Sequence, residues 1–154
     1  GAGPAGTLLH RAAQAKGAEP VNIEPDARRR EAIGGLDCGA ERGFDVGVVA
    51  VGAKAAYEEA LARLRPRGRL VVFSGLAPAD DRIGVGFNQL HYREQTLVGA
   101  YGCAHRHGVA ALNLIAGGAV PVVDLISHRL PLSRLSEALD LVSARRSMKI
   151  LLYP

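Results

Sequence analysis

The sequence predicts an α/β fold, with a parallel β-sheet that is covered by helices on both faces. Two strongly apolar runs, Phe44 to Val51 and Arg69 to Phe73, are typical of strands buried on both faces. Between them, Ala53 to Leu64 has apolar residues at helical spacing, and Arg65 to Gly68 stops this helix and turns the chain. Strand, helix, turn and strand follow within about thirty residues, which is the size of a parallel βαβ unit.

The start of the chain predicts a helix, a short strand and a second helix. Thr7 to Lys16 is an Ala-rich helix that Gly17 ends, because glycine adopts the left-handed conformation of a helix C-terminus readily. Val21 to Ile23 indicates a short strand that ends at Glu24. Ala27 to Ile33 indicates a helix that the following two glycines end.

The second half of the chain continues the alternation of helices and strands. It predicts helices at Phe87–Arg93, at Val109–Ala116 and from a Ser133 cap to Ser143. Strands are predicted at Thr96–Tyr101 and Lys149–Tyr153. The remaining segments are a polar loop at 77–86 and an extended segment at 121–130.

Composition and charge indicate one globular domain with a substantial core. The chain has 154 residues, of which 48% are hydrophobic and 22% charged. The net charge of +4 comes from scattered arginines without a nucleic-acid motif, so a solvated basic surface is expected and nucleic acid is not an expected partner. The chain has only two cysteines, and its sequence shows neither an apolar run of membrane length nor a secretory signal. We therefore expect a cytoplasmic protein without a membrane partner.

The first six residues, Gly1 to Gly6, have the spacing G-x-G-x-x-G at the start of the first predicted helix. The first glycine permits a tight turn, the second lets the backbone approach a pyrophosphate, and the third lets the helix pack closely on the sheet. Pro4 suits the first turn of a helix, whose free N–H groups favour an anion. Glu24, after the next predicted strand, is placed to accept hydrogen bonds from the ribose hydroxyls. Because 19 of the 154 residues are glycine, the spacing alone has little weight.

The loop after Glu24 leaves the choice between NAD and NADP open. The charge of Glu24 repels a 2′-phosphate and favours NAD, whereas Arg28 or Arg29 could pair with that phosphate and favour NADP. For Arg30 a solvated position on the following helix is favoured. Elsewhere, the spacing Cys103-x-His105-x-His107 suggests a metal site, but a loop with incidental histidines is favoured because a fourth ligand is not close in sequence.

The ordered set of features resembles the cofactor-binding half of the medium-chain dehydrogenase/reductase superfamily, in particular the zinc-type alcohol and polyol dehydrogenases. This resemblance implies a Rossmann-type doubly wound parallel sheet. The matching pieces are the turn Gly1–Gly6, Glu24, and the stretches 45–52, 68–75, 91–102 and 126–132.

The resemblance also implies which residues bind the cofactor, through side chain or backbone. The glycine turn and Lys149 would contact the pyrophosphate, and Glu24 and Arg29 the adenosine. Residues 50–52 would line the path from the adenine to the nicotinamide, and the backbone of residues 74–76 would contact the nicotinamide. The full set is Gly1, Gly3, Pro4, Ala5, Gly6, Glu24, Arg29, Ala50, Val51, Gly52, Ser74, Gly75, Leu76 and Lys149.

The chain departs from the family pattern in three places. A strand before Gly1 and the family's catalytic domain with its zinc ligands are absent, and residues 30–43 are too few for the third strand and its helix. Either the chain is a truncated or incomplete piece, or the sheet has lost an element; in both cases the sheet is expected to be truncated at its first strand and shortened around the third. The segment from about residue 103 to 154 would pack on the absent domain, and Thr96–Tyr101 would form the edge of a homo-oligomer.

The expected function is the NAD(H)-binding portion of a zinc-type alcohol or polyol dehydrogenase. The chain alone is expected to be inactive, with NADP a less favoured cofactor, zinc on the absent domain, and an alcohol or polyol as substrate of the intact enzyme. Two alternatives remain: a non-catalytic nucleotide-binding or assembly module, and an NADPH-dependent zinc-free reductase of the same superfamily.

Overall fold

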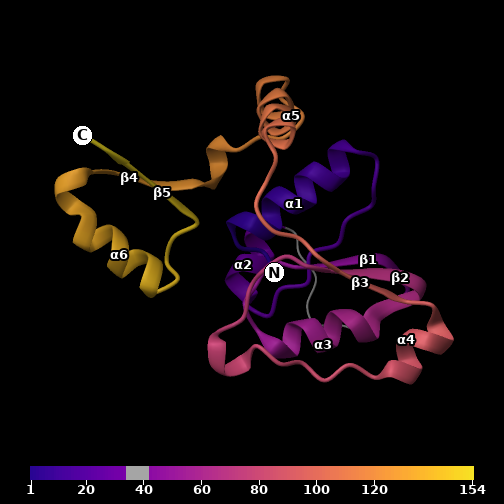
Figure 1. Cartoon of the computed structure of the whole chain (residues 1–154). Helices are drawn as coiled ribbons and strands as arrows, with labels where there is room; N and C mark the ends of the chain where they lie inside the picture. Colours follow the sequence, from indigo (N-terminus) through magenta and orange to yellow (C-terminus); the bar gives the residue numbers. More distant parts are fainter. Residues whose placement is uncertain (34–41) are drawn as a thin grey trace. The chain divides into compact units, whose positions relative to one another are not determined.

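The computed structural model describes residues 1–33 and 42–154, which form two compact units. Unit 1 comprises Gly1 and Ile23–Cys103, and unit 2 comprises Ala2–Asn22 and Ala104–Pro154. Every strand pairing that the structure describes is parallel, and helices connect the strands (Figure 1). The predicted α/β class with parallel strands is therefore confirmed.

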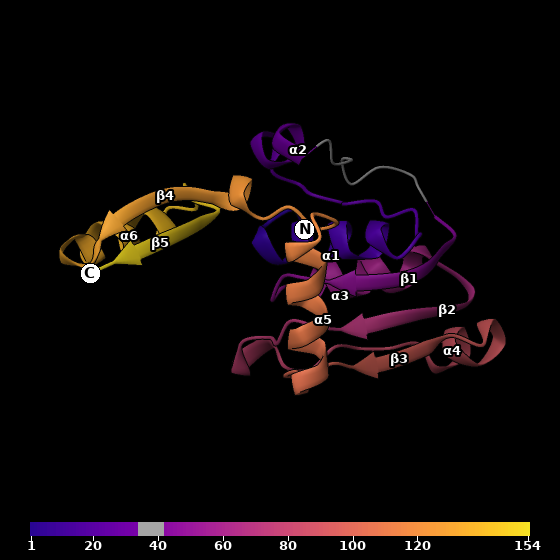
Figure 2. The same cartoon turned by 90° about the horizontal axis from the view of Figure 1, so that it is seen from above.

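Unit 1 is built on a three-stranded sheet. β1 (Phe44–Val49), β2 (Leu64–Val72) and β3 (Thr96–Gly99) lie in the order β1-β2-β3, and their arrows point the same way in Figure 2. Val49 pairs with Val72, and Val72 with Gly99. The three strands therefore end at the same level, and the loops that follow them start from one edge of the sheet, where parallel α/β sheets bind ligands.

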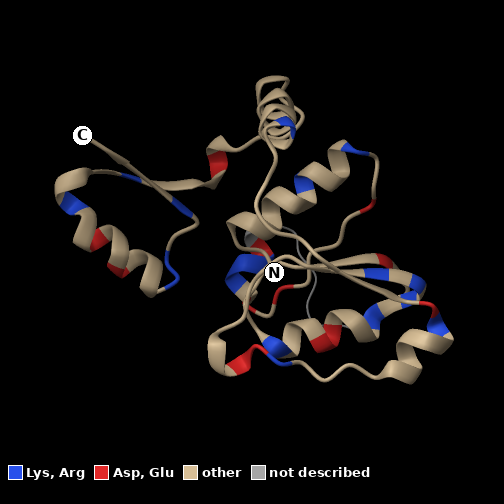
Figure 3. Ribbon diagram, in the orientation of Figure 1, with Lys and Arg blue, Asp and Glu red and all other residues tan. Residues whose placement is uncertain are grey.

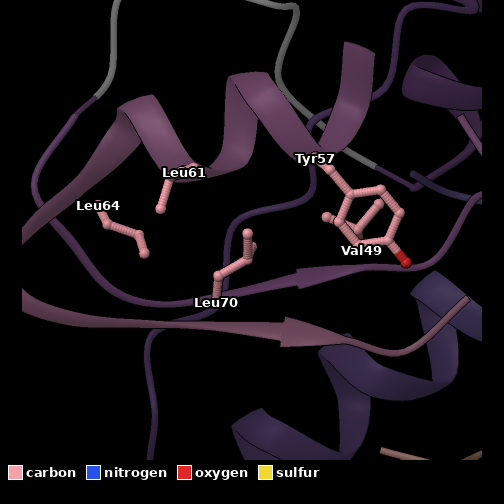
Figure 4. Close-up of a cluster of buried hydrophobic side chains, with 5 residues drawn as sticks. All are labelled: Val49, Tyr57, Leu61, Leu64 and Leu70. Carbon is pink, nitrogen blue, oxygen red and sulfur yellow. The ribbon is translucent and has the colours of Figure 1, made fainter. Parts of the chain in front are cut away.

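Helix α3 (Lys54–Arg63) packs on β1 and β2 and contributes Tyr57 and Leu61 to the hydrophobic core of unit 1. Tyr57 and Leu61 are four residues apart and so share one face of the helix, and Leu64 follows as the first residue of β2. They meet Val49 and Leu70 of the sheet in the cluster that Figure 4 shows. The predicted helix at 53–64 is thus confirmed within one residue at each end.

The opposite face of this sheet is more exposed than the sequence predicts. A Cβ on Gly47 would lie 3.3 Å from the Leu70 side chain, so these two positions face α3. Alternation places Val46 and Val48 on the other face, where their side chains are 54% and 38% exposed. The expectation that β1 is buried on both faces is wrong in this structure, because α3 covers only one of them.

The predicted turn at Arg65–Gly68 lies inside β2 instead of before it. The register of the ladder moves from Phe44 opposite Leu64 to Val46 opposite Arg69, so the extra residues of β2 form a local irregularity. The residues of the predicted turn are thus part of β2.

Two helices of unit 1 have the predicted bounds, α2 (Ala27–Ile33) and α4 (Phe87–Arg93), and a short 3-10 helix, η1 (Pro78–Asp80), lies in the polar loop. The predicted strand at Val21–Ile23 is wrong, since only Ile23 forms an isolated bridge. Prolines at positions 20 and 25 flank this segment and cannot donate to a ladder. The predicted helix stop at Gly34–Gly35 and Cys38 lie outside the described residues.

Unit 2 contains α1 (Pro4–Ala15), α5 (His105–Ala116) and a β-α-β segment. In this segment β4 (Ile126–Pro131) pairs with β5 (Lys149–Tyr153), and α6 (Leu135–Ser143) lies beside them in Figure 1. The bounds of β5 are those predicted from the sequence.

Three expectations for unit 2 need correction. Ser133 does not cap α6, because it lies in a 3-10 turn, η3 (Leu132–Arg134), and Arg134 occupies the N-cap. The segment predicted as extended contains a 3-10 turn, η2 (Val123–Leu125), before β4. Helix α5 begins at His105, so His105 and His107 lie in its first turn and not in a loop.

Charged residues are dispersed over helices, strands and turns, with acidic residues near several of the basic ones (Figure 3). Arg63 pairs with Glu59 at 2.6 Å, Arg67 with Glu94 at 2.6 Å, and Arg134 with Glu137 at 2.5 Å. This dispersed arrangement is the one expected of a solvated surface. Among the helices of the described residues, none has the length and apolarity that crossing a bilayer requires.

Arg11 of α1 ties this helix to the segment that contains η2. Its guanidinium donates to both carboxylate oxygens of Asp124, at 2.8 and 2.5 Å, and to the Pro121 carbonyl at 2.5 Å. The hydrogen bond from Arg11, together with its charge, lowers the pKa of the Asp124 carboxyl below its ordinary value. A planar fork on a carboxylate is the stronger form of such a pair.

The contact between Arg11 and Asp124 is expected to contribute to stability in a pH-dependent way. Because folding lowers the pKa of Asp124, its contribution is fully present above the unfolded value of about 3.9 and is lost as pH falls through the folded value. Asp124→Asn is expected to lower the melting temperature slightly near neutral pH, and the difference from the wild type should shrink on acidification. Thermal unfolding between about pH 7 and pH 3 measures it. Asp140→Asn is the control, and an equal effect there would contradict the assignment.

Candidate functional site

In unit 1 the Glu24 carboxylate lies beside the first glycine of the chain. A Cβ built on Gly1 would lie 3.9 Å from Glu24 Oε2. Glu24 is only 6% exposed, and its Oε1 accepts a hydrogen bond of 3.0 Å from the backbone N–H of Asp26. The carboxylate is therefore held in one orientation next to the predicted turn, as a hydrogen-bond acceptor for ribose requires.

The start of α2 fixes the chain immediately after Glu24. Asp26 Oδ1 accepts a hydrogen bond of 3.0 Å from the N–H of Arg29, which lowers the pKa of the Asp26 carboxyl. The Arg30 guanidinium donates to the carbonyls of Glu24 and Pro25 at 2.9 and 2.7 Å. Arg30 lies on the predicted helix, but its half-buried guanidinium is bound to these carbonyls, so the expectation of a solvated side chain is wrong. Arg29 is half-buried, and its proposed contact with adenosine stays a prediction.

The loops after β1 and β2 meet at the carboxyl edge of the sheet. A Cβ on Gly52 would lie 2.7 Å from the Gly75 carbonyl oxygen, so the two backbones are in direct contact. The N–H of Ser74 donates to the Val49 carbonyl at 3.2 Å. The structure therefore brings Gly52, which the resemblance places on the path from adenine to nicotinamide, next to Ser74 and Gly75, which it places at the nicotinamide. Of the other residues implied there, Val51 is exposed, and Ala50 and Leu76 are half-buried.

Tyr57 is a residue at this edge that the sequence reasoning missed. Its side chain is 3% exposed in the core, and its hydroxyl donates a hydrogen bond to the Ser74 carbonyl. Burial raises the pKa of this hydroxyl above its ordinary value, so it stays a neutral donor. The signal in the sequence was its position four residues before Leu61, which places both side chains on the same face of the helix.

In unit 2 the remaining residues of the glycine turn form the start of α1. Gly3 is the N-cap, Pro4 is the first helical residue, Ala5 is exposed and Gly6 is buried. No side chain caps this end, and its first turn has no acidic residue. The N–H groups of the first turn have no acceptor within the helix, so this end carries partial positive charge that favours an anion.

Two further sequence hypotheses rest on Lys149 and on the histidines that follow Cys103. Lys149 is exposed at the start of β5, its carbonyl accepts from the Ser127 hydroxyl at 3.2 Å, and its role toward a pyrophosphate stays a prediction. Near Cys103, the His107 ring accepts a hydrogen bond of 3.3 Å from the N–H of Ala104. Within residues 1–33 and 42–154, no three His, Cys, Asp or Glu side chains gather in a way that could hold a metal ion.

Strand β3 forms an edge of the sheet of unit 1. Its four residues are exposed, and Tyr101 beyond it is fully exposed. An exposed edge is the surface that the homo-oligomer hypothesis needs, and this hypothesis stays a prediction.

Comparison with known proteins supplies relatives for the whole chain, although no protein-family model matches it. A sorbitol dehydrogenase from Bombyx mori is 30% identical over 176 residues, which cover 99% of this chain and 49% of that enzyme. An uncharacterized zinc-type alcohol dehydrogenase-like protein of Escherichia coli (strain K12) is 27% identical over 108 residues, or 66% of this chain and 27% of that protein. The alignment with sorbitol dehydrogenase is longer than the 154 residues of the chain, so that enzyme contains residues without a counterpart here.

A solved structure shows the same fold. The alcohol dehydrogenase TADH from Thermus sp. ATN1 superposes with a TM-score of 0.87 at 26% identity, over 100% of this chain and 49% of that one. The architecture is therefore that of a Rossmann-type dehydrogenase domain, and the chain spans about half the length of the sorbitol dehydrogenase it matches. By its relatives and its fold, the chain is similar to one half of the zinc-type alcohol and polyol dehydrogenases.

Proposed function

We propose that this chain is the NAD(H)-binding part of an alcohol or polyol dehydrogenase. The observation that supports this most directly is the buried Glu24 carboxylate beside Gly1, with one oxygen fixed by the N–H of Asp26. Its other oxygen, Oε2, is the one nearest Gly1, and the proposal is that this carboxylate accepts hydrogen bonds from the ribose hydroxyls. The similarity to a sorbitol dehydrogenase and an alcohol dehydrogenase is consistent with NAD(H) as the cofactor.

The proposed contribution of the chain is binding and orientation. Glu24 would accept hydrogen bonds from the adenosine ribose, and the start of α1 would stabilise the pyrophosphate charge. The backbone of the contacting loops at Gly52 and Gly75 would border the nicotinamide. When bound, the nicotinamide would accept a hydride from an alcohol carbon or donate one to a ketone.

The family also implies zinc, which the described residues do not fit, because no cluster of three possible ligands occurs among them. We propose that zinc belongs to a part of the intact enzyme outside this chain. The alcohol or polyol substrate is likewise proposed for the intact enzyme.

The test is a comparison of NADH and NADPH binding to the chain by calorimetry. We expect NADH to bind more tightly, because the Glu24 charge opposes a 2′-phosphate. Glu24→Gln keeps an acceptor for the N–H of Asp26 but removes this charge, so NADH affinity should fall about tenfold or more and the preference over NADPH should narrow.

The matched control is Glu31→Gln, which removes the same charge from an exposed position on α2 and should leave both affinities unchanged. Absence of binding for both nucleotides would contradict the proposed function. Tighter binding of NADPH than NADH would instead favour an NADPH-dependent reductase of the same superfamily.

A further inference from the structure

The peptide between Ser74 and Gly75 is oriented by two hydrogen bonds within unit 1. The N–H of Ser74 donates to the Val49 carbonyl at 3.2 Å, and the Ser74 carbonyl accepts from the Tyr57 hydroxyl. One partner belongs to the end of β1 and the other to α3. The loop after β2 is therefore fixed to the core from two sides.

The contact with Tyr57 determines where the next N–H points. In a planar trans peptide the C=O and the following N–H point in opposite directions. Because the Ser74 carbonyl is directed toward the hydroxyl of Tyr57, the N–H of Gly75 is directed away from α3. No described residue accepts a hydrogen bond from this N–H, and Gly75 itself is exposed.

The aromatic ring of Tyr57 and its hydroxyl have separable functions. The ring is part of the buried cluster with Val49 and Leu61, as Figure 4 shows, and a phenylalanine ring would fill the same space. The hydroxyl oxygen, red in that figure, points away from the other four side chains. The ring therefore packs in the core, and the hydroxyl orients the loop after β2.

We propose that Tyr57 is a positioning residue for the nicotinamide end of the cofactor. It acts through the Ser74–Gly75 peptide, whose Gly75 N–H is presented as a donor to the carboxamide oxygen of the nicotinamide. This inference rests on the proposed function, and it assigns a specific role to a side chain on α3 that lies in the core and not in the loop.

The test compares two ligands that differ in the nicotinamide: NADH, and ADP-ribose, which lacks that ring. In Tyr57→Phe the loop loses its link to α3, so NADH should bind about three- to tenfold more weakly while ADP-ribose binds as in the wild type. Calorimetry measures both affinities. The fluorescence of the reduced nicotinamide in bound NADH should also decrease, a change that loss of core stability alone would not produce.

The matched control is Tyr92→Phe, which removes a hydroxyl from a side chain that is 79% exposed and should leave both affinities unchanged. Three results for Tyr57→Phe would each overturn the positioning role. The first is an equal loss of affinity for both ligands, the second is unchanged NADH binding, and the third is that the variant no longer unfolds cooperatively. If the wild type binds ADP-ribose as tightly as NADH, the inference fails while the adenosine site stands. If it binds neither, the proposed function itself fails.

Discussion

Replacing Leu64 by alanine is expected to lower the free energy of unfolding by about 2–5 kcal/mol, the range for a buried leucine whose cavity cannot close. Leu64 is 1% exposed and belongs to the core cluster with Leu61 and Leu70. Its carbonyl also accepts from Arg93 at 2.6 Å and from Gln95 at 3.3 Å, which holds its backbone in place. Because β2 begins here directly after α3, the surrounding structure has little freedom to collapse into the cavity.

Urea unfolding followed by circular dichroism measures this effect. Leu97→Ala in β3 is the matched control within unit 1, because its side chain remains 39% exposed and loses less buried surface. We expect its cost to be clearly smaller than that of Leu64→Ala. Equal costs for the two variants would contradict the placement of Leu64 at the centre of the core.

Gly52→Ala is expected to destabilise the protein by about 1–3 kcal/mol and to weaken NADH binding. The added Cβ would lie 2.7 Å from the Gly75 carbonyl oxygen, which is backbone and has no side-chain rotation to relieve the clash. The loops after β1 and β2 must therefore separate, and both belong to the proposed nicotinamide edge. Urea unfolding and calorimetry with NADH give the two readouts.

The control uses the same substitution on the other side of this contact. A Cβ on Gly75 meets no atom within 4 Å, so Gly75→Ala should leave the free energy of unfolding within about 0.5 kcal/mol of the wild type. A Gly52→Ala variant as stable as Gly75→Ala would show that the two loops do not touch in solution.

Elements with complete local signals could be predicted from the sequence at their observed bounds. Helix α2 follows Asp26, whose carboxylate accepts from the N–H of Arg29, and α4 lies between Gly86 and the left-handed Glu94. In such cases the residues that start and stop the element adjoin it in sequence.

Elements that depend on distant residues could not be predicted in this way. The turn at Arg65–Gly68 appears local, but its pairing with β1 incorporates it into β2. The same limit applies to the candidate site. The cofactor loops follow from motif and resemblance, whereas the Tyr57 contact joins residues 17 positions apart and depends on how α3 is rotated on the sheet.

The exclusively parallel pairing of the described strands has a consequence for folding kinetics. A parallel pair cannot be joined by a tight hairpin, so each ladder forms only after a crossover has closed. In unit 1 these crossovers contain α3 for the first pair and α4 for the second. The rate at which this unit folds is therefore set by loop closure and helix docking, as in other α/β domains of intermediate contact order, and not by formation of a local β-turn.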